Sequence, residues 1–216
     1  MTWTARLALL ALALAGVTCK TVAPYRAEAP DPSKDEGNWA EVRGAATRRA
    51  QLYDRFMHRA TVTATYMSTE VREARNRRLE SWLGWTEPEL KRARDADRAE
   101  TAKYEEFLVG FYTADRWAND LEAPNSVWRV SLRLENGEEL VSRDAEFMHS
   151  NTTLTGLYPY LSVFDTIYRV RFNRAPGEPL AGRRFELEFS SGMGKLTLTF
   201  GDGTMGPIRP DGIPLP

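Results

Sequence analysis

The feature that most constrains the fold is a series of short segments in which apolar and polar residues alternate. Residues 128–134, 167–173, 184–189 and 196–200 carry large apolar side chains at every second position, with Arg, Glu, Ser or Thr between them. A period of two is typical of a β-strand that buries one face. Residues 107–113 are continuously apolar, as expected of a strand that is covered on both faces. The second half of the chain is therefore predicted to be rich in β-structure.

Turn signals separate these segments and favour particular pairings. Asn136-Gly137 predicts a tight hairpin with a return strand over residues 138–147, and Gly192 predicts a turn before the last strand. Residues 61–67 alternate as well and predict an earlier strand. Seven or so strands with one apolar face each favour two sheets packed face to face. We therefore expect an α+β fold, an immunoglobulin-like or similar antiparallel β-sandwich, with a small closed barrel as the alternative.

Helices are expected to decorate this sandwich in the first half of the chain. Residues 38–59 have an approximate apolar stripe within an Ala- and Arg-rich segment, which predicts an N-terminal helix. Residues 68–82 predict a second helix with Ser68 as its N-cap. A third helix is predicted from Thr86, with Glu89 at capping-box spacing. The last two helices are expected to form a hairpin inserted at about residues 68–105.

Composition supports one folded domain over residues 38–216. Hydrophobic residues make up 42% of the chain and charged residues 27%, which is enough apolar material for a packed core. Residues 20–106 contain 17 basic and 16 acidic side chains, and residues 107–216 contain 11 and 14. Neither half has the basic excess of a nucleic-acid-binding protein, so we expect no nucleic acid among the partners.

The first residues have the three-part pattern of a secretory signal, which we place at residues 1–18. A short basic start is followed by the apolar run LALLALALA over residues 7–15 and then by Gly16-Val17-Thr18. This run is too short for a transmembrane helix, which needs roughly 20 apolar residues. Residues 20–37 contain three prolines and almost no large apolar side chain. We therefore expect a flexible tether over residues 19–37.

Cys19, the only cysteine of the chain, directly follows the signal and resembles the acylated cysteine of bacterial lipoproteins. The resemblance covers roughly the first twenty residues; Gly16 and Thr18 stand where such motifs usually carry Leu and a small residue. It implies cleavage before Cys19, attachment of lipid such as palmitate to Cys19, and anchoring in the cell envelope. Lys20 replaces the Asp that tends to retain lipoproteins at the inner membrane, which implies the outer membrane. The alternative is cleavage after Ala15, which would give a soluble periplasmic or secreted binding protein.

We expect no metal site, and the loop over residues 115–122 is only a weak candidate for one. Asp115, Asn119, Asp120 and Glu122 place carboxylates and an amide within eight residues, and hard cations such as Ca²⁺ prefer these oxygen ligands. The spacing does not match an EF-hand. We therefore favour a structural role, in which Asp115 and Asp120 cap turns, Trp117 packs on the edge of the sandwich and Arg116 pairs locally.

A hydrolytic site is a second possibility. His149 and Ser150, together with Asp144, Glu146 and Asp165, supply a base, a nucleophile and carboxylates to orient the base. No G-x-S-x-G motif surrounds any serine, so the sequence gives no elbow of the kind that hydrolases use. An exported hydrolase or metal-dependent enzyme therefore stays the alternative to a protein without catalytic residues or cofactors.

The remaining candidates have ordinary structural interpretations. His58 is expected near the end of the first helix, where a cation interacts favourably with the helix dipole. Tyr158 and Tyr160, followed by Phe164 and Tyr168, could stack on a carbohydrate or peptide, but we favour rings that fill the core.

The charged residues of the helical hairpin alternate in sign and favour a solvated surface. The basic members are Arg72, Arg75, Arg77, Arg78, Lys91, Arg92, Arg94 and Arg98. The hairpin would dock on a protein partner if it exposed a contiguous apolar stripe. The function that we expect is therefore binding, scaffolding or assembly at the cell envelope, with the membrane reached through the lipid on Cys19.

Overall fold

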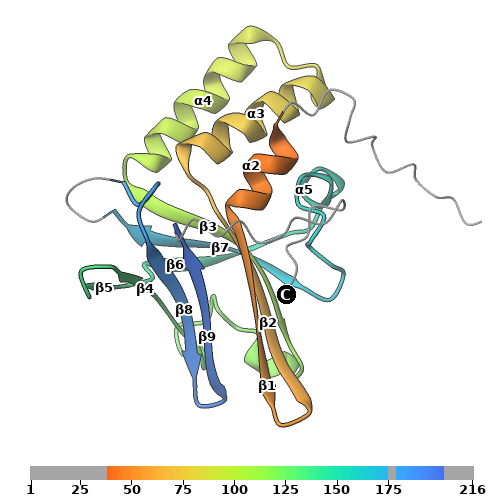
Figure 1. Cartoon of the computed structure of the whole chain (residues 1–216). Helices are drawn as coiled ribbons and strands as arrows, with labels where there is room; N and C mark the ends of the chain where they lie inside the picture. Colours follow the sequence, from red (N-terminus) through yellow and green to blue (C-terminus); the bar gives the residue numbers. More distant parts are fainter. Residues whose placement is uncertain (1–37, 175–178, 202–216) are drawn as a thin grey trace, which may run out of the picture. The chain divides into compact units, whose positions relative to one another are not determined.

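The computed structural model describes residues 38–174 and 179–201, which form nine strands and four α-helices. The signal, the tether and Cys19 lie outside the described residues. The strands form two antiparallel sheets, and Figure 1 shows them packed as two layers with helices gathered at one end. The predicted α+β sandwich is confirmed, and the closed-barrel alternative is wrong.

The first sheet has five strands in the order β1-β2-β3-β7-β6, and the second has four in the order β5-β4-β8-β9. The bounds of the first are β1 (Thr47–Asp54), β2 (Met57–Tyr66), β3 (Tyr104–Thr113), β7 (Thr166–Asn173) and β6 (Asp144–Met148). Those of the second are β5 (Glu139–Val141), β4 (Arg129–Leu134), β8 (Phe185–Ser191) and β9 (Gly194–Phe200).

Aromatic side chains fill the space between the two sheets. Phe107 on β3 is fully buried, and the centroid of its ring lies 5.2 to 6.0 Å from those of Tyr66, Phe172, Phe185 and Phe200. Edge-to-face aromatic pairs at this distance contribute about 0.5–1.5 kcal/mol beyond the area they bury. The alternation read from the sequence determines which face of each strand joins this core.

The helices cover the outer face of the five-stranded sheet (Figure 1). They are α2 (Trp39–Ala45), α3 (Thr69–Leu83), α4 (Glu87–Thr101) and α5 (Thr152–Leu157). A second apolar cluster lies beneath them, formed by Trp39, Val71, Leu108, Leu157 and Tyr158 among others. The sheet is therefore buried on both faces where the helices sit, which explains the continuously apolar sequence of β3.

The hairpin of α3 and α4 is confirmed, with the predicted end signals in place. Ser68 is the N-cap of α3 and accepts a hydrogen bond from the Val71 amide at 3.3 Å. Gly84 ends α3 with a φ of 63°, a conformation that glycine adopts without steric cost. The Thr86 amide and hydroxyl both donate to Glu89, at 2.7 and 2.6 Å. These local contacts define the hairpin independently of the sheets.

The helix predicted over residues 38–59 is wrong beyond its first two turns. Helix α2 ends at Ala45, and the chain continues as β1 and the start of β2. Ala50 and Leu52 face the main core, whereas Arg49 and Gln51 on the alternating positions are exposed. Pairing with β2 over the whole length of β1 outweighs the helix propensity of the Ala- and Arg-rich segment. His58 therefore lies in β2 and not at a helix end.

The single return strand predicted over residues 138–147 is also wrong. The Asn136-Gly137 turn forms as expected, but β5 is short and pairs with β4. The amide of Ser142 still donates to Val130 on β4, and the amide of Arg143 already donates to Arg171 on β7. The chain thus passes from one sheet to the other within two residues, and β6 then completes the five-stranded sheet.

Candidate functional site

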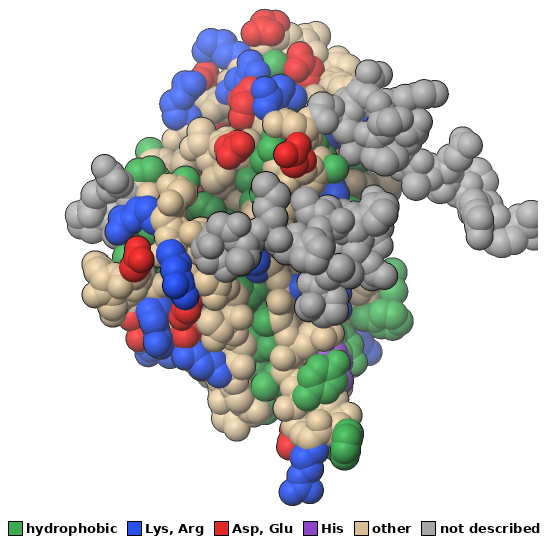
Figure 2. Space-filling view, in the orientation of Figure 1, with side chains coloured by type: hydrophobic (Ala, Val, Ile, Leu, Met, Phe, Trp, Pro, Cys, Tyr) green, Lys and Arg blue, Asp and Glu red, His purple; other side chains and the backbone are tan. Residues whose placement is uncertain are grey.

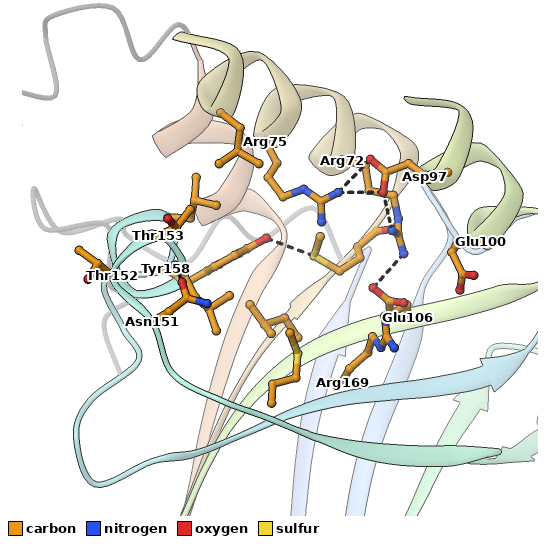
Figure 3. A pocket seen from close by; sticks show the side chains of 17 residues that line it. Arg72, Arg75, Asp97, Glu100, Glu106, Asn151, Thr152, Thr153, Tyr158 and Arg169 are labelled. Atoms are coloured by element: carbon orange, nitrogen blue, oxygen red, sulfur yellow. Dashed lines mark hydrogen bonds and ion pairs between the residues drawn. The ribbon is translucent and has the colours of Figure 1, made fainter. Parts of the chain in front are cut away.

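A cavity of about 720 Å³ lies between the helical hairpin, α5 and the outer face of the five-stranded sheet (Figure 3). This volume is in the range of small-molecule sites. The side chains that line it are Met67, Arg72, Arg75, Leu79, Ala96, Asp97, Glu100, Glu106, Leu108, Met148, Asn151, Thr152, Thr153, Leu154, Leu157, Tyr158 and Arg169. One wall carries charges and the other is mainly apolar.

The charged wall is built from three elements that meet through ion pairs. Arg72 and Arg75 lie one turn apart on α3, Asp97 comes from α4, and Glu106 comes from the outer face of β3. Arg72 bridges Asp97 at 2.9 Å and Glu106 at 3.0 Å. Arg75 donates to both oxygens of Asp97, at 2.8 and 2.9 Å. Two cations and two carboxylates therefore balance in this network.

Asp97 is the centre of the network. It also accepts a hydrogen bond from the Asn76 amide at 2.7 Å. Burial alone would raise the pKa of Asp97, but Arg75, Asn76 and Arg72 together hold it below the ordinary value of 3.8. Asp97 is therefore ionised at neutral pH and ties α4 to α3.

The outer face of β7 supplies the floor of the cavity. Arg169 lines the cavity and pairs with Glu146 on β6. Arg171 lies two residues further along the same face and pairs with Asp144 at 2.9 Å. The ion pairs follow from the antiparallel register, because Asp144 stands opposite Arg171 and Glu146 opposite Arg169.

The apolar wall comes from Leu108 and Met148 on the sheet and from Leu154 and Leu157 on α5. Tyr158, at the end of α5, is fully buried, and its hydroxyl donates to the sulfur of Met67 at 3.5 Å. Burial raises the pKa of Tyr158, although Arg75 and Arg72 act in the opposite direction. The Tyr158 hydroxyl is therefore protonated and acts as a hydrogen-bond donor.

Contacts with α2 hold α5 in place. The indole of Trp39 and the guanidinium of Arg43 both donate to the Leu157 carbonyl, at 3.2 and 2.7 Å. The Trp39 ring also packs edge-on against Tyr158, with a centroid distance of 5.5 Å. Asn151 is the N-cap of α5 and accepts from the Leu154 amide at 2.8 Å. The apolar wall is thus fixed at both ends of α5.

The loop over residues 115–122 uses its polar groups for turns. Asp115 accepts from the Trp117 amide at 3.1 Å, and Asp120 accepts from the Ser126 hydroxyl at 2.9 Å. Asn119 donates to the Phe111 carbonyl, and Glu122 is exposed. The expectation that Trp117 packs on the sandwich edge is wrong, because this side chain is 91% exposed. Among the described residues, no group of three His, Cys, Asp or Glu side chains is arranged to hold a metal ion.

The structure does not bring the proposed hydrolytic residues into a triad. The carboxylates of Asp144 and Glu146 pair with arginines on β7, and Asp165 accepts from the Ser162 amide at 2.7 Å. His149 is exposed and lies edge-on against Phe147. Each carboxylate is therefore committed to a partner other than His149.

The remaining candidates are also resolved. His58 lies between the rings of Tyr53 and Tyr112 and hydrogen-bonds Thr61 at 2.7 Å, so its role in the described fold is packing on β2. Of the later aromatic residues, Tyr158, Tyr160 and Tyr168 are buried, as the sequence favoured, whereas Phe164 is exposed.

The helical hairpin presents mainly charge to solvent. Figure 2 shows blue and red side chains interleaved over this end of the molecule. Of the large apolar side chains described in α3 and α4, Leu83 is the exposed one, so they form no contiguous apolar stripe. The interpretation of the arginines as solvated is wrong for Arg72 and Arg78, which are 5% and 3% exposed. The sequence contained a signal for the burial of these two arginines, because both lie next to the apolar stripe of Val71, Ala74 and Leu79 on the helix.

The search for membrane spans and the comparisons with known proteins complete the description. In the part of the chain that the structure describes, no helix has the length and hydrophobicity required to cross a membrane. No family model matches the sequence, and no curated protein matches it. Among solved structures, a protein of unknown function from Burkholderia pseudomallei is similar, with 12% identity and a TM-score of 0.31. The match covers 65% of this chain and 76% of that protein.

Proposed function

We propose that this chain is an exported protein anchored in the cell envelope by lipid on Cys19, and that its folded part binds a small amphipathic ligand. The observation that carries the binding role is the cavity under the helical hairpin, which combines a charge-balanced wall with an apolar wall. Sites for small molecules combine apolar walls with positioned polar groups, and this cavity has both, with a larger share of charged side chains than is usual. The anchor rests on the sequence pattern that ends at Cys19.

Binding without catalysis is the simpler role for this cavity. Asp97 and Glu106 are held by arginines, and Tyr158 is kept neutral by burial. A general base is a group that can accept a proton near neutral pH. Asp97, whose pKa is lowered by its partners, is poorly suited to that task.

The anchor is tested by the intact mass of the mature protein purified from membranes. We expect the wild-type protein to carry a diacylglycerol-sized increment that is absent from the Cys19→Ser variant. The prediction fails if the wild-type protein begins at Gly16 with an unmodified thiol and is recovered entirely in the soluble fraction.

Ligand binding is tested by native mass spectrometry of the same protein after gentle purification. We expect a second, non-covalent adduct, and we expect it to be lost in Thr153→Trp, because the indole would fill the mouth of the cavity. Thr155→Trp is the matched control, since Thr155 lies on the same helix but does not line the cavity. Equal occupancy in the two variants would place the ligand elsewhere.

A further inference from the structure

We infer that the cavity selects an acyl chain with an uncharged ester or amide carbonyl, and discriminates against a carboxylate amphiphile of the same length. This inference rests on the proposed binding role of the cavity. It names the class of ligand, which the cavity volume alone does not.

The charge balance of the cavity is the first reason. Arg72 and Arg75 are already neutralised by Asp97 and Glu106, at distances of 2.8 to 3.0 Å. The side chains of Arg72 and Glu106 are 6% and 8% exposed, so solvent screens them little. An added carboxylate would lose its hydration without gaining an unpaired cation, because Arg72 and Arg75 hold Asp97 and Glu106 and Arg169 holds Glu146. An uncharged head group avoids this cost.

The unused donors of the cavity are the second reason. The Nε atom of Arg75 is buried and has no hydrogen-bond partner. The Tyr158 hydroxyl donates to a thioether sulfur, which is a weak acceptor, and its oxygen also interacts with the Arg75 side chain. Figure 3 shows the Tyr158 hydroxyl on the side of the cavity where the Arg75 guanidinium projects. Two donors with unsatisfied or weakly satisfied hydrogens require an acceptor oxygen, and a carbonyl supplies one.

The apolar wall is the third reason. Leu154 and Leu157 on α5 line the cavity together with Leu108 and Met148 on the sheet. Methionine side chains adapt to irregular apolar ligands. Each methylene of an alkyl chain that is buried beside this wall strengthens binding roughly fourfold. The polar and apolar walls together therefore fit the carbonyl and the alkyl chain of one acyl group.

Calorimetric titration tests this ligand class. The protein is the full chain in its Cys19→Ser form, so that no acyl chain of its own competes. The probes are methyl decanoate and decanoate, each below its aggregation concentration. We expect the ester to bind and decanoate to bind at least roughly tenfold more weakly, because its carboxylate would be buried without a free cation as partner.

One conservative variant tests the donors. Tyr158→Phe removes the hydroxyl and keeps the ring. It should weaken binding of methyl decanoate roughly two- to tenfold, the usual effect of one hydrogen bond. Tyr160→Phe is the control: Tyr160 is also buried, but it bonds Thr65 at 2.8 Å and does not line the cavity. It should leave the affinity unchanged.

Three outcomes would overturn the inference: decanoate binding as tightly as the ester, Tyr158→Phe behaving like Tyr160→Phe, or no probe binding at all. The proposed function fails separately, when native mass spectrometry finds no adduct that depends on the open cavity. An adduct that is lost in Thr153→Trp but is not an acyl ester or amide would refute the ligand class and leave the binding role standing.

Discussion

Replacing Asp97 with Asn should destabilise the protein far more than its position on a charged surface helix suggests. Asp97 receives hydrogen bonds from Arg72, Arg75 and Asn76 and joins α4 to α3. Removing one member of a buried ion pair typically costs about 3–5 kcal/mol, because the other charge stays buried without a partner. The side chains of Asp97 and Arg75 are 15% and 22% exposed, so solvent partly screens them. In the variant, Arg72 still has Glu106 as a partner. We therefore expect a loss near the lower limit, about 3 kcal/mol.

Thermal and urea denaturation followed by circular dichroism would measure this loss. For a domain of this size, about 3 kcal/mol corresponds to a decrease in Tm of roughly 6–12 °C. Asp95→Asn is the matched control, since Asp95 lies on the same helix and pairs with Lys91 and Arg98 at the surface. Exposed pairs contribute little to stability, so the control should be close to the wild type. Equal stability of the two variants would refute the role assigned to Asp97.

The pH dependence provides an independent check. The pKa of Asp97 in the folded protein lies below its ordinary value of 3.8. A lowered pKa means that the stabilisation is present above that value and is lost as the pH falls through the folded pKa. The difference in unfolding free energy between the wild type and Asp97→Asn should therefore be constant near neutral pH and should shrink below about pH 3.8. A difference that persists in acid would contradict an electrostatic origin.

Three further substitutions test the packing around the site. Gly110→Ala should cost roughly 1–3 kcal/mol in chemical denaturation, because its Cβ would lie 2.8 Å from Leu161, whereas Gly192→Ala meets no atom within 4 Å and should be nearly neutral. Trp39→Ala should cost about 3–5 kcal/mol by the same assay, and a loss below 1 kcal/mol would refute its role as the anchor of α5. Tyr168→Phe should cost about 1 kcal/mol, because its hydroxyl donates to Asn119 in the loop after β3 at 3.1 Å. Hydrogen exchange in this loop should increase, and unchanged exchange would contradict the assignment.

The strands that face the main core could be predicted because their side chains alternate with a period of two. Burial of one face is encoded locally, residue by residue, and the same holds for the N-caps of α3 and α4. The segment of β1 could not be predicted in this way. Its Ala- and Arg-rich sequence favours a helix locally, and it becomes a strand only because it pairs with β2. The turn that joins β1 to β2 has no turn signal of the usual kind in the sequence.

The binding cavity depends on contacts between residues that are distant in the sequence. Arg72 meets Glu106 because α3 and α4 fold back over β3, and Tyr158 meets Met67 across 91 residues. In the sequence, Arg72 looks like one of many solvated arginines, since a helix surface and a buried ion pair use the same residue types. The sequence alone determined the sandwich, the helical hairpin and the pattern around Cys19. Which charges are buried, and which apolar side chains they face, was decided by the tertiary structure, because burial depends on what the rest of the chain places opposite each residue.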